Sequence, residues 1–331
     1  MTEKDRFNQT MLDFLQACPT PFHAVAQMSL RLDEAGFVEL NEAEAWHLEP
    51  GGKYYVQRNQ SSLVAFVYGR SPLLDTGWRL WGAHTDSPCL KLKPQADLEK
   101  KGYRQWGVQV YGGALLNPWF DRDLSLAGRV HFKTTGGEHR RCLINLERPI
   151  AIIPSLAIHL DREANNARTV NPQTDMPPIV CQGTDDSDLD SLLLEHLRQT
   201  GNSDAGEILD FDLSLFDTQP PAQVGWRNEF IASARLDNLL SCYVGLAGLL
   251  GAGDTTHSVL VCNDHEEVGS QSAIGDQGPM LKSILQRIAG THENFERAIH
   301  GSLMVSADNA HGVHPNYADR HDNNHGPLLN A

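Results

Sequence analysis

The most constraining feature of this sequence is a pattern that occurs four times: a short apolar segment runs directly into a turn of acidic and histidine side chains. The four turns read AHTDS from residue 83, RLDN from 235, DHEEVG from 264 and SADNAH from 306. In open α/β sheets, ligands bind in the crevice beyond the carboxyl ends of the strands. If the four segments are parallel strands of one sheet, the four turns would therefore open onto one crevice. The pattern predicts an α/β fold with a binding site at that edge of the sheet.

Each turn alone has an ordinary explanation. His84 would be a loop histidine bonded to the backbone, Asp237 an N-cap of the apolar helix that follows it, and Asp308 a turn residue. Glu266 and Glu267 would be a solvated acidic pair. We prefer a shared site, because the ordinary explanations require the same coincidence at the ends of four strands.

Carboxylates that share a crevice need a positive partner. Two of them about 4 Å apart repel by roughly 4 kcal/mol at an effective dielectric constant near 20, so a group of them takes up protons or holds cations. Mixed imidazole and carboxylate ligands suit zinc, with manganese or cobalt as alternatives. Two metal ions about 3.5–4 Å apart are usual in aminopeptidases and phosphatases, and a spare carboxylate can act there as the general base.

The composition and the absence of other motifs exclude several classes of function. The 331 residues carry a formal net charge of −15 without a basic patch, which argues against nucleic-acid binding. No apolar stretch approaches the roughly 20 residues that span a bilayer, and the N-terminus has no apolar signal core, so we expect no membrane partner and a cytoplasmic location. The six cysteines stand singly without a C-x-x-C pair, as reduced thiols do. The motifs H-E-x-x-H, G-x-S-x-G and the phosphate loop are absent from the sequence.

The predicted elements divide the chain into three parts. Residues 1–94 and 229–331 alternate helices with short strands, including two helices over 5–36, a hairpin from Lys53 and an apolar helix over 239–250. Residues 95–228 contain short β-like segments with many glycines, and an acidic segment over 183–207 resembles a solvated helix with flexible flanks. The sequence thus predicts one α/β domain built from both ends of the chain and interrupted by a mostly-β insertion.

Several longer motifs match a known family. The motifs PTPFHAV, GAHTDSP, YGGALLNPWFDRDLSLAGRV, PSLAIHLDR, DTQPP, RLDN, DHEEVGS and SADNAHGVHPNY occur in this order along nearly the whole chain. In these motifs the chain resembles the aspartyl aminopeptidase family of co-catalytic zinc metallopeptidases. The resemblance implies a zinc-aminopeptidase-like mixed sheet with flanking helices, interrupted by an inserted β domain used for assembly. It also implies two zinc ions per subunit, homo-oligomers that are commonly dodecamers, and release of N-terminal, often acidic, residues from peptides.

The resemblance also implies a role for each residue of the predicted crevice. His84 and Asp308 would hold one metal ion, and Glu267 would hold the other. Asp237 would bridge the two ions, and Glu266 would be the general base.

Two further residues receive roles from the resemblance alone. Asp86 would orient His84, and His159, in the predicted insertion, would reach into the site of a neighbouring subunit. Without the resemblance, the sequence favours a structural role for His159, as a histidine in a core or an interface.

The resemblance also has consequences for the end of the sequence. The family's chains continue beyond the region that matches HDNNHGPLLNA and supply a further histidine ligand to the metal ion held by Glu267. His321 and His325 do not match that position. Either the sequence is an excerpt or a truncated product, or the protein has an incomplete second metal site. Two alternatives to an aminopeptidase stay open at this point: a related two-metal carboxypeptidase or N-acyl amino acid deacylase, and an inactive assembly subunit.

Overall fold

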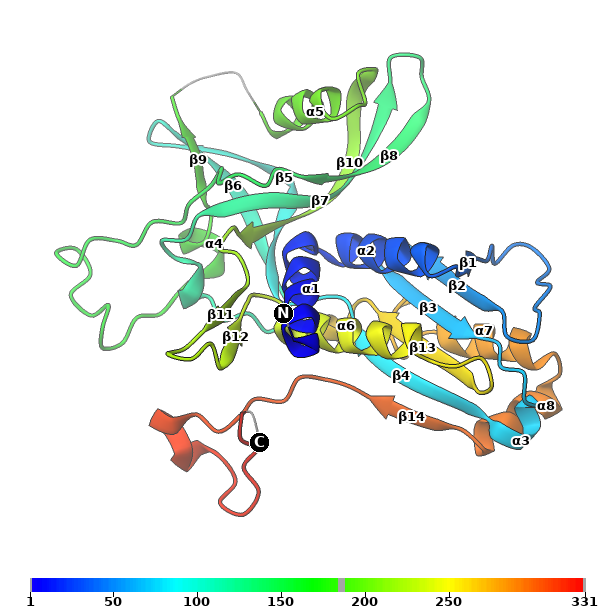
Figure 1. The fold of residues 1–331 in the computed structure, drawn as a ribbon. Coiled ribbons are helices and arrows are strands. Elements are labelled where there is room, and N and C mark those ends of the chain that lie inside the picture. The colour runs from blue at the N-terminus through cyan, green and yellow to red at the C-terminus, as the bar shows by residue number, and fades with distance from the viewer. Residues whose placement is uncertain (1, 184–187, 330–331) are drawn as a thin grey trace.

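The computed structural model describes residues 2–183 and 188–329, and its two large sheets each carry a hydrophobic core of their own (Figure 1). The first sheet is mixed and has the strand order β1-β2-β3-β13-β4-β14. Its strands are β1 (Val38–Glu39), β2 (Lys53–Arg58), β3 (Ser62–Val67), β4 (Trp78–His84), β13 (His257–Asn263) and β14 (Leu303–Ser306). The strands β13, β4 and β14 are parallel neighbours, whereas β3 is antiparallel to both β2 and β13. Three parallel strands therefore end at the same edge.

Helices cover both faces of the first sheet. One face packs against α1 (Glu3–Ala17), α2 (Pro21–Glu34) and α6 (Leu236–Leu250), and the other against α7 (Met280–Ala289) and α8 (His292–His300), with the short α3 (Leu73–Thr76) beside α8 (Figure 1). Side chains of β3 alternate between the two cores, since Leu63 and Ala65 join the first and Val64 and Phe66 the second. Burial on both faces explains why β3 and β13 read as continuous apolar runs, whereas the edge strand β14 is exposed along its length.

The second sheet is antiparallel throughout and has the order β8-β7-β10-β5-β6-β9. Its strands are β5 (Cys89–Lys100), β6 (Tyr103–Tyr111), β7 (Leu124–Thr134), β8 (His139–Asn145), β9 (Ile179–Gln182) and β10 (Ala205–Asp217). The helix α5 (Leu189–Gln199) buries Leu189, Leu193 and Leu197, one every four residues, in the core of this sheet. The short elements α4 (Pro172–Asp175), β11 (Ala222–Val224) and β12 (Phe230–Ala232) complete this part of the chain.

The α/β class with a mixed sheet and flanking helices is confirmed. The two N-terminal helices, the hairpin β2–β3 and the apolar helix α6 are present as predicted. The helix predicted in the acidic segment is α5, but it is not solvated all round, because its leucines pack into the core of the second sheet; residues 184–187 of that segment lie outside the described residues. The limits predicted for the insertion stay a prediction. In the described chain, no helix is both long and apolar enough to cross a membrane.

One prediction about the sheet is wrong. The segment before Asp237 was expected to be a fourth parallel strand, but β12 pairs only with β11 in a separate two-stranded sheet. Asp237 lies instead in the first turn of α6, which starts at Leu236. Three turns therefore come from neighbouring strands, and the fourth comes from the start of a helix that covers the sheet.

Candidate metal centre

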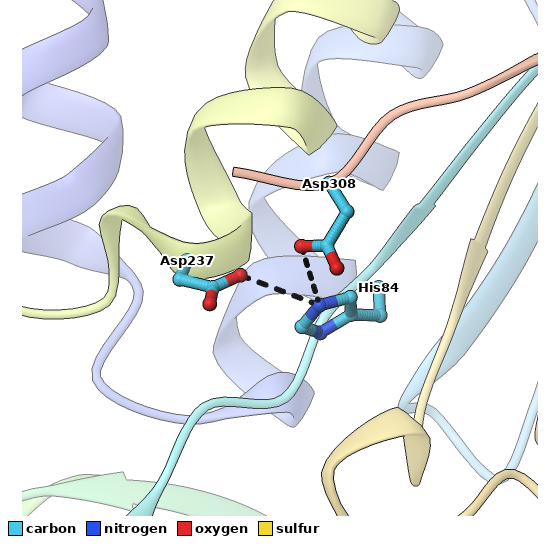
Figure 2. Close-up of side chains that lie close together, drawn as sticks. All are labelled: His84, Asp237 and Asp308. Atoms are coloured by element: carbon cyan, nitrogen blue, oxygen red, sulfur yellow. Dashed lines mark ion pairs between the residues drawn. The ribbon is translucent and has the colours of Figure 1, made fainter. Parts of the chain in front are cut away.

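The ring of His84 meets two carboxylates at the edge where the parallel strands end. Its Nε2 atom lies 3.4 Å from Oδ1 of Asp237 and 3.5 Å from Oδ1 of Asp308 (Figure 2). One ligand atom from each of the three residues lies within 4.8 Å of the others. The imidazole is buried, with 5% of the residue exposed, whereas both carboxylates are open to solvent. The group therefore forms a shallow site with one buried ligand and two accessible ones.

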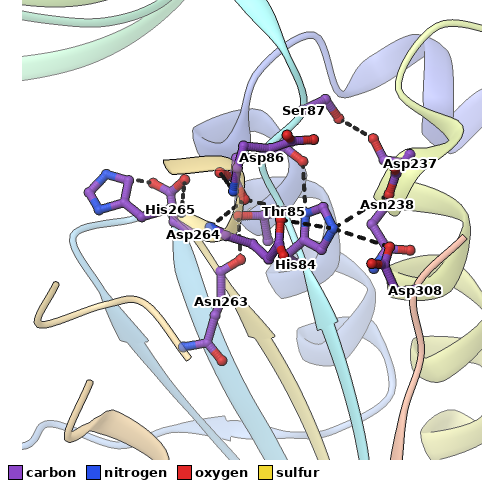
Figure 3. Close-up of polar contacts among 12 residues, drawn as sticks. His84, Thr85, Asp86, Ser87, Asp237, Asn238, Asn263, Asp264, His265 and Asp308 are labelled. Atoms are coloured by element: carbon purple, nitrogen blue, oxygen red, sulfur yellow. Dashed lines mark hydrogen bonds and ion pairs between the residues drawn. The ribbon is translucent and has the colours of Figure 1, made fainter. Parts of the chain in front are cut away.

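The sheet and α6 bring these residues together from distant parts of the sequence. His84 ends the strand β4, which lies between β13 and β14, and the main chain after β14 continues the ladder when Ala307 N donates to Gly82 O at 2.8 Å. Asp308 follows directly. On the other side, the hydroxyl of Ser87 donates to the main-chain oxygen of Asp237 at 2.5 Å (Figure 3). The strand end that carries His84 thus contacts both carboxylate-bearing segments.

The three residues fit a zinc ion. Donor atoms that bind one zinc ion at about 2.0–2.1 Å in a tetrahedron lie about 3.3–3.4 Å from each other, close to the two separations found at His84. Within the part of the chain that the structure describes, no lysine or arginine forms an ion pair with Asp237, Asp308, Glu266 or Glu267. The donor set and the excess of negative charge both match a divalent cation.

Asp86 contacts the other ring nitrogen of His84. The Nδ1 atom of His84 lies 3.1 Å from the main-chain oxygen of Asp86 and 3.4 Å from its Oδ1 atom (Figure 3). The same buried carboxylate accepts hydrogen bonds from the main-chain N–H groups of Glu266 and Glu267, at 3.2 and 3.1 Å. A histidine that donates its Nδ1 proton in this way keeps Nε2 free for a metal ion. Asp86 also ties the DHEEVG turn to the turn that carries His84.

The pKa values of this pair depend on each other. Burial by itself would lower the pKa of His84, but the hydrogen bond and charge of Asp86, with the charges of Glu266 and Asp237, raise the pKa of His84 to about 9. Burial opposes the ionisation of Asp86 too, yet its bonds with His84 and Tyr111 hold the pKa of Asp86 below its usual value. The metal-free imidazole is therefore protonated at neutral pH, and a bound cation would take the place of that proton.

The turn after β13 presents the two adjacent glutamates. Both lie in a 3₁₀ turn, Glu266–Val268, that follows His265 in a left-handed conformation. Glu266 Oε2 lies 3.9 Å from His84 Nε2. Burial raises the pKa of Glu267 to about 7; the nearby His84 opposes this shift, and the charges of Asp86, Asp237 and Glu266 add to it. The other two side chains of the turn, Asp264 and His265, face each other, with His265 Nε2 3.7 Å from Asp264 Oδ2, and His265 Nδ1 pairs with the hydroxyl of Ser272 at 2.9 Å.

The second sheet contributes to the site through Tyr111, which sequence reasoning did not select. Its hydroxyl, at the end of β6, donates to Oδ2 of Asp86 at 2.7 Å, and burial raises the pKa of Tyr111, so it stays a donor at neutral pH. The next residue, Gly112, has φ +68°, and a Cβ atom there would lie 3.0 Å from Cβ and Oε2 of Glu267. A glycine is required at this close approach. No spacing in the sequence could have linked Tyr111 to Asp86, because the contact depends on how the two sheets meet.

The structure does not bring His159 to the other predicted site residues. It is exposed on the loop between β8 and α4 and forms no hydrogen bond or ion pair within residues 2–183 and 188–329. Its predicted role concerns a neighbouring subunit and stays a prediction.

Comparison with known proteins decides the family. Residues 14–331 match the family described as aminopeptidase I zinc metalloprotease (M18). The chain belongs to this family. A probable M18 family aminopeptidase 2 from Pseudomonas fluorescens (strain Pf0-1) is 56% identical over 330 residues, which are 99% of this chain and 77% of the relative. The resemblance found in the motifs is confirmed, and the carboxypeptidase, deacylase and inactive-subunit alternatives are not favoured.

Solved structures of this family have the same fold. A chain of the Ape4 and Nbr1 complex superposes with a TM-score of 0.94 at 35% identity, over 98% of this chain and 67% of that one. The mApe1 dodecamer of S. cerevisiae superposes with a TM-score of 0.83 at 29% identity, over 99% of this chain and 77% of that one. This M18 chain is therefore a metallopeptidase related to aminopeptidases.

Proposed function

We propose that this M18 protein removes N-terminal residues from peptides at the site around His84, with two zinc ions. The observation that carries the proposal is the convergence of His84 Nε2 with one carboxylate oxygen each of Asp237 and Asp308. In this proposal, His84 and Asp308 hold one ion, Glu267 holds the other and Asp237 binds both. Manganese or cobalt would suit the same ligands.

The metal ions, Asp86 and Glu266 would each have a separate role in the hydrolysis. When bound, the ions would supply a water molecule whose pKa is lowered from about 15.7 to near 7, together with polarisation of the scissile carbonyl. Asp86 would hold the Nδ1 proton of His84 and keep the ring in place. Glu266, half-buried with its Oε2 atom 3.9 Å from His84 Nε2, would accept a proton from the attacking water and transfer it to the leaving amino group.

The free amino terminus of a substrate would bind beside one of the two ions, whose charge offsets that of the carboxylates. An α-amino group has a pKa of about 7.7–8.0, so its neutral form, with a free electron pair, is accessible near neutral pH, whereas acetylation makes that electron pair unavailable. An aminoacyl anilide should therefore be hydrolysed, whereas the same anilide with an acetylated amino group, and N-acyl amino acids, should not. The proposed preference for acidic N-terminal residues rests on the family resemblance, and the same assay with aspartyl and leucyl anilides measures it.

The role of Glu266 gives the most specific test of this mechanism. We expect Glu266→Gln to lower the turnover number by at least about 100-fold, because the amide cannot accept the proton. The zinc content should stay unchanged, because Glu266 is not among the proposed ligands. The matched control is Glu293→Gln, which changes an exposed glutamate on α8. Wild-type turnover in the Glu266→Gln enzyme would reject the assigned role.

We also propose that residues 95–228 form an inserted unit through which the protein assembles into a homo-oligomer. Support comes from the large apolar side chains exposed in and near the second sheet, among them Leu115, Leu160 and Trp226. Further support comes from the related mApe1 of S. cerevisiae, which forms a dodecamer. In such an assembly His159 would be free to reach the site of a neighbouring subunit. Burial of these side chains against another copy would remove their apolar surface from water.

A further inference from the structure

The dipeptide Asp-Asn occurs at two of the proposed metal ligands. Asn238 follows Asp237, and its side-chain Nδ2 donates to the main-chain oxygen of Ala307 at 2.8 Å. Ala307 is the residue that precedes Asp308, so this bond connects the residue after one ligand to the residue before the other. In Figure 3, Asn238 lies beside both carboxylates.

A second hydrogen bond connects the same two segments in the opposite direction, again from the residue after one aspartate to the residue before the other. Asn309 follows Asp308, and its Nδ2 donates to the main-chain oxygen of Leu236, the residue that precedes Asp237. The two ligand segments are therefore joined by a reciprocal pair of side-chain to main-chain bonds. We call this pair, formed by Asn238 and Asn309, the amide clasp.

The amide clasp connects a segment that has few other restraints. Residues 308–312 make no main-chain hydrogen bond within the described chain: the last bond before them is from Ala307 N to Gly82 O, and the next is from Val313 N to Pro327 O. The side chain of Asp308 is 62% exposed. The position of Asp308 relative to Asp237 thus depends on the bonds of Ala307 before it and on the side chain of Asn309 after it.

Uncharged amide donors suit the two segments that carry Asp237 and Asp308 better than charged side chains would. Asp237 and Asp308 repel each other when both are ionised, so their segments need a restraint. A lysine or arginine between them would provide one, but it would also neutralise the negative charge that attracts a dication. Amide groups that bind the neighbouring main-chain oxygens restrain both segments and leave the carboxylate charge in place.

The environment of Asn238 indicates that an amide is needed at this position for its hydrogen bond and not to fill space in the core. The residue is fully buried, and its Oδ1 atom has no hydrogen-bond partner among the described residues. An unpaired buried acceptor of this kind is unfavourable for folding. An apolar side chain would avoid this loss, so the N–H donated to Ala307 is the feature that requires an asparagine.

We propose that Asn238 and Asn309 are positioning residues whose amide clasp sets the separation of Asp237 and Asp308 around Nε2 of His84. The clasp acts through the two ligand segments and does not touch the metal ion or the substrate. This inference rests on the proposed metal site.

The test compares zinc affinity with the stability of the metal-free protein. The variants are Asn309→Ala and Asn238→Leu, with Asn323→Ala as the matched control, because Asn323 is exposed in the same C-terminal segment and its side chain makes no hydrogen bond within the described residues. Zinc affinity is measured by competition with a chromophoric chelator, and thermal unfolding is followed after the metal has been stripped. We expect both clasp variants to bind zinc about 10–100-fold more weakly than the wild type, the range found when an outer partner of a metal ligand is lost. The control should stay within about twofold of the wild type, and the metal-free unfolding midpoint of Asn238→Leu should not fall.

Each outcome leads to a different conclusion. If the wild type binds no zinc, the proposed metal site fails and the clasp fails with it. If the wild type binds zinc and Asn309→Ala binds it equally well, the clasp alone is wrong. An equal loss of affinity in Asn323→Ala also overturns the clasp. Should Asn238→Leu fail to fold, Asn309→Ala, on the weakly restrained segment, still decides the question.

Discussion

His84 has a carboxylate beside each of its two ring nitrogens. Asp86 is buried at Nδ1, and the open carboxylates of Asp237 and Asp308 lie at Nε2, so the ring has one side for orientation and one for a ligand. The arrangement resembles the carboxylate–histidine–metal groups in which the outer carboxylate fixes the ring. In this protein Asp86 also binds Tyr111 and the backbone of the glutamate turn. One buried residue therefore connects both sheets to the site.

A histidine away from the site should make the stability depend on pH. His23, in the first turn of α2, pairs with the hydroxyl of Thr20, and burial followed by the charge of Arg235 lowers the pKa of His23 to about 4. The unfolded chain, with a histidine pKa near 6.5, binds this proton between about pH 6.5 and 4 while the native state does not, so the free energy of unfolding falls as the pH drops through that window. At pH 5 the expected loss from His23 is about 1–2 kcal/mol.

The matched variant for this prediction is His23→Gln, which keeps a polar group beside Thr20 but does not titrate. Urea unfolding of both metal-free proteins at pH 7.5 and pH 5 gives the comparison. We expect the wild type to lose about 1–2 kcal/mol more than the variant between the two pH values. Equal losses would show that His23 is not held neutral by the fold.

At the residue scale, the sequence predicted which side chains lie close together better than the reasons for their positions. His84 and Asp308 follow neighbouring parallel strands, as expected from the strand ends. Asp237 joins them from the start of α6. It was predicted at this site correctly, but from a parallel strand that does not exist in the first sheet. Tyr111 was missed because its contact crosses between two sheets. The two Asp-Asn pairs are visible in the sequence, but their reciprocal hydrogen bonds could not be predicted, because they depend on the tertiary structure that brings the two segments together.

At the scale of elements, Gly245 allows α6 to lie close against the first sheet. A Cβ atom at Gly245 would lie 2.7 Å from Trp81 Nε1 and from Leu260 Cδ1, whereas one at Gly248 would meet no atom within 4 Å. We expect Gly245→Ala to destabilise the protein by about 1–3 kcal/mol, because the helix must move off the sheet. Gly248→Ala should stabilise it by up to about 1 kcal/mol through helix propensity. Thermal and urea unfolding of the two variants measures both effects, and a stabilising Gly245→Ala would contradict the packing described here.

The elements with strong local signals were predicted, and those set by tertiary pairing were not. The helix α1 has an apolar stripe and a capping box at Thr2 and Asp5, and the strands β2 and β3 form a local hairpin. The strand β12 looks like the others in sequence, but its partner is β11 and not the main sheet. The chain also passes from the first sheet to the second between His84 and Cys89, with no change in composition that would mark the passage.

At the scale of the whole molecule, the exposed apolar side chains predict self-association. Leu115 is 79% exposed, Leu160 is 75% exposed and Trp226 is 97% exposed. Each side chain of this size contributes roughly 1.5–3 kcal/mol when it is fully buried. We therefore expect an oligomer by multi-angle light scattering at micromolar concentration, and Trp226→Ser or Leu160→Ser should weaken it. Leu30→Ser, on α2, is the control that should leave the assembly unchanged, and a monomeric wild type would contradict the prediction.

The central claim is that His84, Asp237 and Asp308 together hold a zinc ion. Crystals of the zinc-loaded protein, measured on both sides of the zinc absorption edge, test it directly. We predict an anomalous peak about 2.0–2.1 Å from Nε2 of His84, in contact with carboxylate oxygens of Asp237 and Asp308. Zinc peaks that all lie elsewhere on the molecule, with this site showing none, would contradict the account.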